Sequence, residues 1–522
     1  MYCIPKGHTC TTYEVRSKYE VRGIFLLMSL IMINLAANFQ IVKNMLRDKG
    51  TKKIEEIKTD FNPERFDEEK ITGIFKALKI SESLKEFNNL KQSGYSVKAI
   101  LSLLLVMAVT GQKTVSSSLS SLSEQGISIG KDVFYRLKNN ENICWRLILW
   151  HIVMKFIQIT LSTALPDEPD KPHCLIFDDT TVKKSGKKME KLGRVWDHVE
   201  QRSILGFKIL VMLYWDGKSF IPADFSIHRE KGKKELKPYG MTQKELRRQY
   251  SKKRTRESES NKRIKELDTK KTDMMLRMFY NAMYRCLRVD YVLVDSWFTC
   301  EALINAVIDR GVHLIGMYKT ATTKFLYRGQ PLTYSEINSR ITKVQRCRSL
   351  KYHYKRADVM YGDTPLTLFF SRQGKNGKWK VFLTTDTSLG FKKMVELYQI
   401  RWTVEVFNKE AKGLLNLGGC QSSNFDAQIA DTTISMIAYI LLAFRFRYEH
   451  YESKGALYRS MNAEFLRITI DRRLWGLFLE TIQIVAQILE IDADDLLERV
   501  LTNPDAEQLI NRFFENGLKE AA

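Results

Sequence analysis

The sequence predicts a multidomain α/β protein, and three of its features support this prediction. The chain has 522 residues, more than one hydrophobic core usually holds, so two to four domains are expected. Residues 173–318 alternate short apolar runs of strand length with segments of helical periodicity, as in a sheet covered by helices. The flanking residues, 61–165 and 451–522, show helical periodicity alone. We therefore expect a central mixed sheet between helical N- and C-terminal regions.

The composition indicates a globular protein with a phosphate-rich partner. Hydrophobic residues make up 44% of the chain, which is typical of a folded protein. Lys and Arg total 83 against 60 Asp and Glu, giving a net charge of +23. A merely soluble basic protein is the alternative, but a pI near 9.5 at this size favours nucleic-acid binding.

The eight cysteines predict neither a zinc site nor a disulfide framework. None forms a Cys-x-x-Cys pair, and they are scattered along the chain. Scattered thiols fit a reducing cytoplasm.

Residues 1–60 are an uncertain N-terminal extension. The apolar run at residues 24–37 is shorter than the roughly 20 residues of a membrane span, so no membrane association is expected. A signal peptide cleaved after Ala36-Ala37 is conceivable. The long segment before the run favours an amphipathic helix, or a start placed too early, before Met28 or Met45.

Residues 61–165 are predicted to be helical. Ser96 is a candidate N-cap for a helix that ends at Gly111, and residues 145–159 repeat apolar side chains at helical spacing. A helical DNA-binding domain and a helical packing domain with a polar surface are both compatible with this pattern.

The periodicity changes after Pro166, Pro169 and Pro172, which mark a linker. Residues 173–177 form a short apolar strand that ends at Asp178 and Asp179. Two further strands, residues 204–215 and 219–227, are joined by an Asp-Gly hairpin signal. The charged residues 229–271 predict a long exposed helix or a mobile insert, a solvated segment for which DNA contact stays open.

The next elements alternate regularly. Residues 274–287 and 300–310 are predicted helices, and residues 291–295 and 313–318 are predicted strands, the first of them ending at Asp295. Residues 321–386 alternate β-type runs with turns and predict an all-β insertion. Residues 387–450 return to helix, and a helix from Tyr398 is expected to stop at Gly413.

One face of this last helix carries a polar stripe. At about 100° per residue, its four members fall within a sector roughly 60° wide; they are Tyr398, Arg401, Glu405 and Lys412. A solvated charged face is the ordinary interpretation of such a stripe. Apolar neighbours on both sides favour instead a carboxylate that binds metal beside phosphate.

The order of strands, helices and acids matches a ribonuclease-H-like α/β domain, formed by residues 170–320 and 387–450. One carboxylate follows the first strand, a second follows the fourth strand, and a third lies on the last helix. Two-metal phosphoryl transfer requires such acids to converge, because they must hold two divalent cations about 3.5–4 Å apart.

The quoted motifs resemble one family of bacterial insertion-sequence transposases, the Asp-Asp-Glu enzymes of the insertion-sequence-four family. The resemblance covers roughly residues 170–450. It is carried by Asp-Asp-Thr-Thr at 178–181, by Val-Leu-Val-Asp-Ser-Trp-Phe at 292–298, and by the spacing Tyr-x2-Arg-x3-Glu-x6-Lys from Tyr398 to Lys412. In that family the first acid directly precedes Thr, which implies Asp179 rather than Asp178.

The resemblance implies a cut-and-paste transposase with the metal-binding triad Asp179, Asp295 and Glu405. It implies two Mg²⁺ ions, for which Mn²⁺ can substitute, and a hairpin intermediate at the transposon end. Partners would be double-stranded DNA, both terminal inverted repeats and target, bound by a homodimer in the cytoplasm at the nucleoid. A structure-specific nuclease on the same fold and an inactive DNA-binding relative remain alternatives.

The resemblance also implies DNA-contacting residues. Arg401 and Lys412 would hold phosphates, and Tyr398 would hydrogen-bond near the scissile end. An aromatic residue would stabilise an unstacked base; Trp379 is the first candidate for this role, and Trp402, beside Arg401, is the other.

Overall fold

The structure is a computed structural model that describes residues 78, 94–111, 114–116, 129–163, 171–232, 234–374, 377–448, 451–462 and 482–504. The chain divides into two compact units. One consists of residues 69–115 and 131–459, and the other of residues 1–68, 116–130 and 460–522. All of the described strands belong to the first unit.

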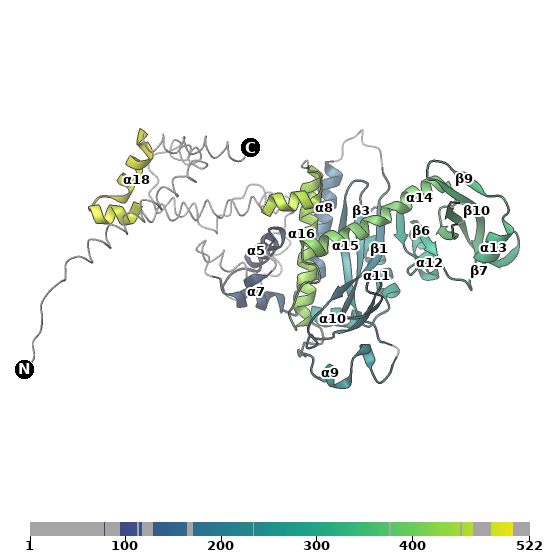
Figure 1. Cartoon of the computed structure of the whole chain (residues 1–522), viewed down its shortest axis with the longest axis horizontal. Coiled ribbons are helices and arrows are strands. Elements are labelled where there is room, and N and C mark those ends of the chain that lie inside the picture. Colours follow the sequence, from purple (N-terminus) through teal and green to yellow (C-terminus); the bar gives the residue numbers. More distant parts are fainter. Residues whose placement is uncertain are drawn as a thin grey trace, which may run out of the picture. The chain divides into compact units, whose positions relative to one another are not determined.

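A single mixed sheet organises the first unit (Figure 1). Its centre contains β1 (Cys174–Lys183), β3 (Arg202–Trp215), β4 (Phe220–His228), β5 (Tyr291–Val294) and β6 (His313–Tyr318). β3 pairs antiparallel with β1 and β4, whereas β5 pairs parallel with β1 and β6. This arrangement confirms the predicted ribonuclease-H-like sheet.

Two features of the first strands differ from the prediction. β1 does not end at Asp178 and Asp179 but continues to Lys183, because its ladder with β3 extends to the pair Lys183 and Gly206. A strand that the sequence analysis missed, β2 (Gly193–Asp197), pairs with the N-terminal part of β3. Both differences arise because β3 is 14 residues long and offers partners beyond the apolar runs.

The predicted insertion continues the same sheet rather than forming a separate one. β12 (Lys380–Thr384) pairs antiparallel with β6 and β11 (Thr364–Gln373) pairs with β12. The sheet ends with β10 (Tyr352–Tyr361), β9 (Gln345–Cys347), β7 (Lys324–Tyr327) and β8 (Gln330–Thr333).

The prediction that this insertion is all-β needs a correction, because α13 (Tyr334–Arg340) follows β8. The Thr333 hydroxyl accepts from the Glu336 amide, and the Glu336 carboxylate accepts from the Thr333 amide. This capping box is a signal for a helix start that the sequence already contained.

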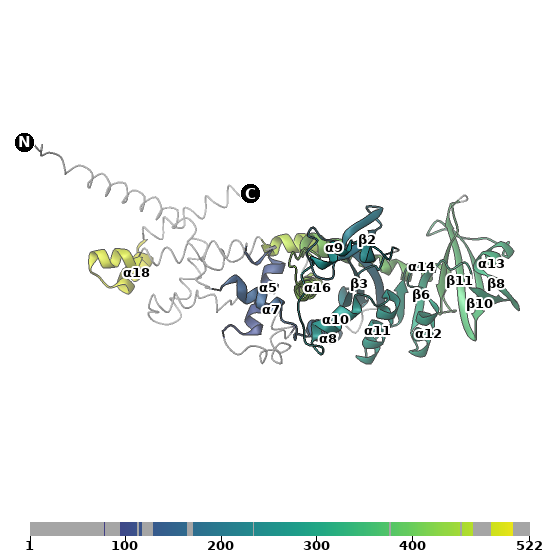
Figure 2. The same cartoon turned by 90° about the horizontal axis from the view of Figure 1, so that it is seen from below.

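Helices cover both faces of the sheet. α11 (Lys271–Tyr284) and α12 (Glu301–Asp309) lie on one side, and α14 (Phe391–Gln399) lies on the other (Figure 2). α8 (Trp145–Ser162) and α16 (Phe425–Tyr448) pack against each other and against β4. The N-terminal helices α5 (Val97–Val109) and α7 (Lys131–Lys138) pack against α16, and Ser96 caps α5 as predicted.

α16 is long and apolar enough to cross a membrane by composition alone. However, 89% of its apolar window is buried inside the protein. Its apolar side chains are therefore explained by its position in the core, where they contact α8, α5 and β4.

The helix that carries the polar stripe is interrupted, which corrects the predicted continuous helix. α14 begins before the stripe and ends at Gln399, and a 3₁₀ turn, η4 (Ile400–Trp402), follows that helix. The next helix, α15 (Thr403–Leu414), contains Gly413 instead of stopping there. A 3₁₀ stretch inside a helical run often marks a functional hinge or a strained sequence. Here it places Arg401 between the two α-helical segments.

Residues 229–271 do not form the long exposed helix or mobile insert that their composition predicts. They contain η3 (Pro238–Gly240), α9 (Gln243–Arg247) and α10 (Glu259–Glu266). Several of their charged side chains are buried in ion pairs with the core; Arg254, for example, pairs with Glu190 and Asp426. Charge density therefore misled the prediction, because several of these charges are buried in ion pairs with the core.

In the second unit, α18 (Ala493–Thr502) is capped by Asp492, whose carboxylate accepts from two backbone amides. The predictions for residues 1–60 lie outside the described residues. The described cysteines are all free.

Candidate active site

Asp178 and Asp295 meet at the centre of the sheet because β1 and β5 are parallel neighbours. Their register pairs Phe177 with Val294, so Asp178 and Asp295 occupy the next position on each strand path. Residues at equivalent positions of neighbouring strands project from the same face. The two carboxylates therefore share one face at the carboxyl end of β5.

A tight turn fixes Asp295 after β5. Its Oδ1 atom accepts from the Trp297 amide at 2.9 Å, and its carbonyl accepts from the Thr299 hydroxyl at 2.9 Å. Thr299 packs against Gly316 on β6, where a Cβ atom would lie only 2.3 Å from the Thr299 hydroxyl. A glycine at this position of β6 thus lets the turn pack closely against the sheet.

Arg401 connects Glu405 to this pair of aspartates. One guanidinium nitrogen lies 3.3 Å from Asp178 Oδ2 and the other lies 2.8 Å from Glu405 Oε1. η4 and α15 lie against β5 and β1, so the helix presents both side chains to the sheet. The structure therefore gathers Asp178, Asp295, Arg401 and Glu405.

Asp179 does not join this group. Its carboxylate contacts Lys271 at the start of α11 and lies 3.8 Å from Lys208 Nζ on β3. Adjacent residues of a strand project from opposite faces, and α11 covers the face opposite α14. The sequence-based choice of Asp179 over Asp178 therefore has no support from the geometry of the sheet.

The shared site is electrostatically unfavourable for two bare carboxylates. Burial, together with the negative charge of Asp295, raises the pKa of Asp178 to about 7. Burial also raises the pKa of Asp295. Arg401 opposes both shifts. Carboxylates that repel one another are stabilised by a cation placed between them.

The acids around Arg401 are the candidate ligands of a divalent cation. Within the described ranges, no three His, Cys, Asp or Glu side chains lie close enough to form a metal site. Arg401 instead supplies the positive charge between Asp178 and Glu405. The available donors are carboxylate oxygens, which Mg²⁺ and Mn²⁺ prefer. Asp178, Asp295 and Glu405 are the residues that would hold such an ion.

Tyr398 and Lys412, the ends of the polar stripe, also face the sheet. The Tyr398 hydroxyl donates to the Val294 carbonyl at 3.2 Å, and Lys412 Nζ donates to the Thr181 carbonyl at 2.9 Å. Both side chains therefore tie the stripe to β5 and β1, on either side of the carboxylates.

The candidate aromatic residues differ sharply in exposure. Trp379 is half-buried, and its ring is covered by Arg372 and Lys355, at 4.5 and 5.0 Å from its centroid. Trp402, next to Arg401, is 61% exposed. Trp297, two residues after Asp295, is 73% exposed, and the sequence analysis did not single it out. Its position directly after a strand-end acid was the available signal.

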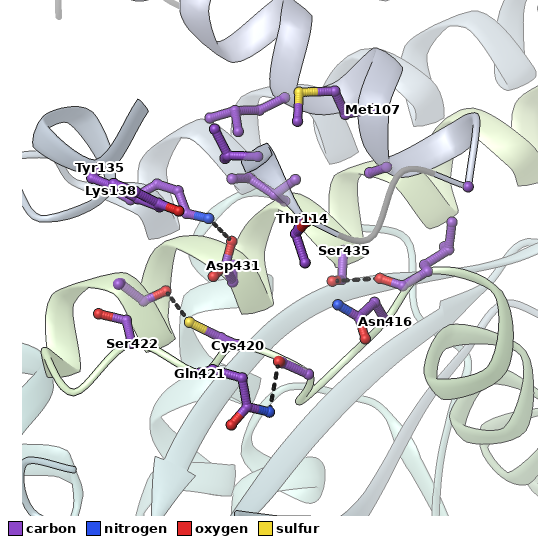
Figure 3. Close-up of a pocket in the computed structure, with 18 of the residues that line it drawn as sticks. Met107, Thr114, Tyr135, Lys138, Asn416, Cys420, Gln421, Ser422, Asp431 and Ser435 are labelled. Atoms are coloured by element: carbon purple, nitrogen blue, oxygen red, sulfur yellow. Dashed lines mark hydrogen bonds and ion pairs between the residues drawn. The ribbon is translucent and has the colours of Figure 1, made fainter. Parts of the chain in front are cut away.

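A separate pocket of about 560 Å³ is not the candidate site. It lies between α5, α7, α16 and the loop after α15, and several of its polar side chains have internal partners (Figure 3). Lys138 pairs with Asp431 at 2.7 Å, Ser435 donates to the Leu415 carbonyl, and Cys420 donates to the Ala427 carbonyl. It contains none of the four residues gathered at β1 and β5.

A ribonuclease-H-like sheet with carboxylates at neighbouring positions of β1 and β5 is suited to metal-assisted cleavage of phosphodiesters. Residues 102–348 match the family model of the DDE superfamily endonucleases. No curated protein matches the chain. The matched range includes both aspartates and ends before Glu405. Over that range the chain is similar to DNA-cleaving enzymes that use divalent metal ions, which supports a nuclease or transposase type of activity.

Proposed function

We propose that the protein is a cut-and-paste DNA transposase of the insertion-sequence-four type. The observation that carries the proposal is that Asp178 and Asp295 share one face of the sheet, while Arg401 contacts both Asp178 and Glu405. The family match supports the DNA-cleaving part of this function. The spacing of Tyr398, Arg401, Glu405 and Lys412 supports the transposase type.

In this proposal the three carboxylates hold two divalent ions. When bound, such ions lower the pKa of a water molecule and neutralise charge on the leaving oxygen. The chain's own residues orient the substrate. Arg401, already 3.3 Å from Asp178 Oδ2, would turn from carboxylate to phosphate, since a guanidinium binds either group in the same fork geometry. Lys412 and Tyr398 would position neighbouring phosphates.

The proposed reaction begins with hydrolysis at the transposon end. The freed 3′-hydroxyl then attacks the opposite strand to form a hairpin, which is reopened before strand transfer into target DNA. The proposed active form is a homodimer that pairs two transposon ends, located in the cytoplasm at the nucleoid. The predicted domain division is kept in this proposal, and residues 321–386 contact the transposon end.

The first prediction tests this function through its metal requirement. Purified protein should nick, and then join, a duplex carrying an inverted repeat that brackets the gene, in Mg²⁺ or Mn²⁺. It should be inactive in Ca²⁺, because the larger ion binds without imposing octahedral geometry on the reacting oxygens. A gel time course of labelled strands provides the measurement.

Three outcomes would contradict the proposal in different ways. Cleavage without strand transfer would favour a structure-specific nuclease on the same fold. DNA binding without cleavage in any metal would favour an inactive relative. Full activity in the presence of a chelator would rule out the two-ion mechanism.

The second prediction concerns the base beside the scissile phosphate. A hairpin bends the backbone so sharply that its end base unstacks, and an aromatic platform offsets this by roughly 1–3 kcal/mol. Exposure favours Trp402 for this role over Trp379, whose ring is already covered by two cations. Trp402→Ala should slow hairpin formation by about 10- to 100-fold more than it slows first-strand nicking.

The matched control is Trp379→Ala, assayed on the same labelled end with nick and hairpin resolved. It should affect both steps equally and lower thermal stability, because the Trp379 ring packs against Arg372 and Lys355. A hairpin-specific defect in the Trp379 variant alone would assign the role to Trp379 instead.

A further inference from the structure

The segment between β4 and α11, residues 229–270, is called here the basic loop. It is held to the core by buried ion pairs. Arg254 lies 2.6 Å from Glu190 and 2.7 Å from Asp426, and all three side chains are at most 4% exposed. Lys252 Nζ adds a second contact to Asp426 at 2.8 Å. Breaking such buried pairs leaves uncompensated charges, so the basic loop is held in one conformation.

The acids of the basic loop are mostly used internally. They bind backbone amides or basic side chains of the core and of the loop itself: Glu230 with the Trp196 amide, Glu245 with Lys187, Glu259 with Lys262, Glu266 with Arg146, and Asp268 with Arg229. The exposed acids left between residues 231 and 257 are Glu235 and Glu257.

Most of the described cations between residues 231 and 257 are not used in this way. Eight are exposed and form no ion pair with an acid of the described chain: Lys231, Lys234, Lys237, Lys244, Arg247, Arg248, Lys253 and Arg256. Between residues 231 and 257, eight cations face solvent unpaired against two exposed acids, Glu235 and Glu257. The loop therefore presents a strongly positive surface on a fixed backbone, which suits a polyanion.

The basic loop leaves and returns at the end of the sheet toward which β1 runs on past Asp178. β4 ends at His228, which pairs with Lys208, and Lys208 pairs with Thr181, three residues beyond Asp178. At the other end Lys271 contacts Asp179. α9 lies beyond the lower end of the sheet (Figure 1).

The distance from the acids to the loop can be expressed in base pairs. The backbone of β1 runs on from Asp178 to Lys183, which is about 17 Å at roughly 3.3 Å per residue. The next residues contact the loop, since the Lys188 carbonyl accepts from the Tyr250 amide at 2.7 Å. For a duplex that follows β1, at a rise of about 3.4 Å per base pair, the path of about 17 Å from Asp178 to Lys183 corresponds to roughly five base pairs.

We propose that the basic loop binds the phosphate backbone of duplex DNA about half a helical turn from the scissile phosphate. This inference rests on the proposed function, which places the scissile phosphate at Asp178 and Asp295. The exposed groups are cations on a fixed support, so the contact is to phosphates and is independent of base sequence. The loop anchors the duplex while the carboxylates act on its end.

The test uses the variant Arg247→Gln/Arg248→Gln, which leaves the buried anchor Arg254 and the α9 capping box intact. Its matched control is Lys392→Gln/Lys393→Gln, an adjacent exposed pair on α14. Binding is measured by fluorescence anisotropy without divalent metal, across a salt series. The probes are inverted-repeat duplexes that extend about three or about twelve base pairs to either side of the cleavage site.

We expect the loop variant to reduce the slope of log Kd against log salt by about 1.8, at roughly 0.9 per lost phosphate contact. The wild type and the control should bind the longer duplex more tightly than the short one, and the loop variant should lose most of this gain. Unchanged slope and length dependence would overturn the proposal. The proposal would also be overturned if the loop variant lost affinity only for single-stranded RNA or for polyglutamate, tested as alternative polyanion probes, and kept its affinity for duplex DNA.

This result is independent of the proposed function's own test. Wild-type protein that binds duplex through the loop but never cleaves would contradict the transposase proposal and leave the loop assignment intact. Wild-type protein that cleaves, with a loop variant indistinguishable from it in binding, would contradict the loop assignment alone.

Discussion

Asp178→Asn should abolish DNA cleavage while Asp179→Asn should remain active. Asp178 shares a face with Asp295 and is bridged to Glu405 through Arg401, whereas Asp179 faces Lys271 and Lys208. Losing a ligand of catalytic metal removes several kcal/mol of transition-state stabilisation, which corresponds to a rate loss of roughly 10³-fold or more. Asp295→Asn and Glu405→Gln should give the same loss, with DNA affinity largely retained.

Thermal unfolding separates the two aspartates independently of activity. Asp178 has a raised pKa because its ionised form is less favourable in the folded protein, so removing its charge should not lower stability. Asp179→Asn removes the countercharge of Lys208, whose side chain is only 5% exposed, and should lower stability. An inactive Asp179→Asn protein beside an active Asp178→Asn protein would return the first acid to the position implied by the family resemblance.

Arg254→Met should destabilise the protein by about 3–5 kcal/mol. The substitution leaves Glu190 and Asp426, at 2% and 0% exposure, as buried carboxylates without their main partner. The basic loop should detach from the core, so DNA affinity should fall together with the unfolding midpoint in chemical denaturation.

The control for this prediction is Arg256→Met, two residues along the chain. Arg256 is exposed and pairs with no acid of the described chain, so its loss should change stability by less than about 0.5 kcal/mol. Equal stability of the Arg254 and Arg256 variants would mean that the buried ion pairs contribute nothing to holding the loop.

Much of the fold followed from local pattern. The apolar run at Tyr291–Val294, the hairpin signal after Trp215 and the spacing from Tyr398 to Lys412 each predicted a real element or a real stripe. These features depend on residues close together in sequence, where strand and helix periods act directly. The order of these elements was enough to identify the ribonuclease-H-like sheet.

Local sequence pattern could not choose between two neighbouring residues of the same kind. Asp178 and Asp179 are both polar residues after an apolar run, and the sequence does not state the register between β1 and β5. Only the pairing of Phe177 with Val294 determines which carboxylate faces Asp295. A shift of one residue in that register would exchange the two faces.

The roles of the charged and aromatic residues also depended on the tertiary structure. The sequence by itself determined that residues 229–271 are basic and that several Trp residues lie near the acids. The tertiary structure decided that Arg254 is buried while Arg256 is exposed, and that Trp379 is covered while Trp402 is free. The physical reason is that burial and ion pairing are set by residues from other elements, such as Glu190 and Asp426, which lie far away in the chain.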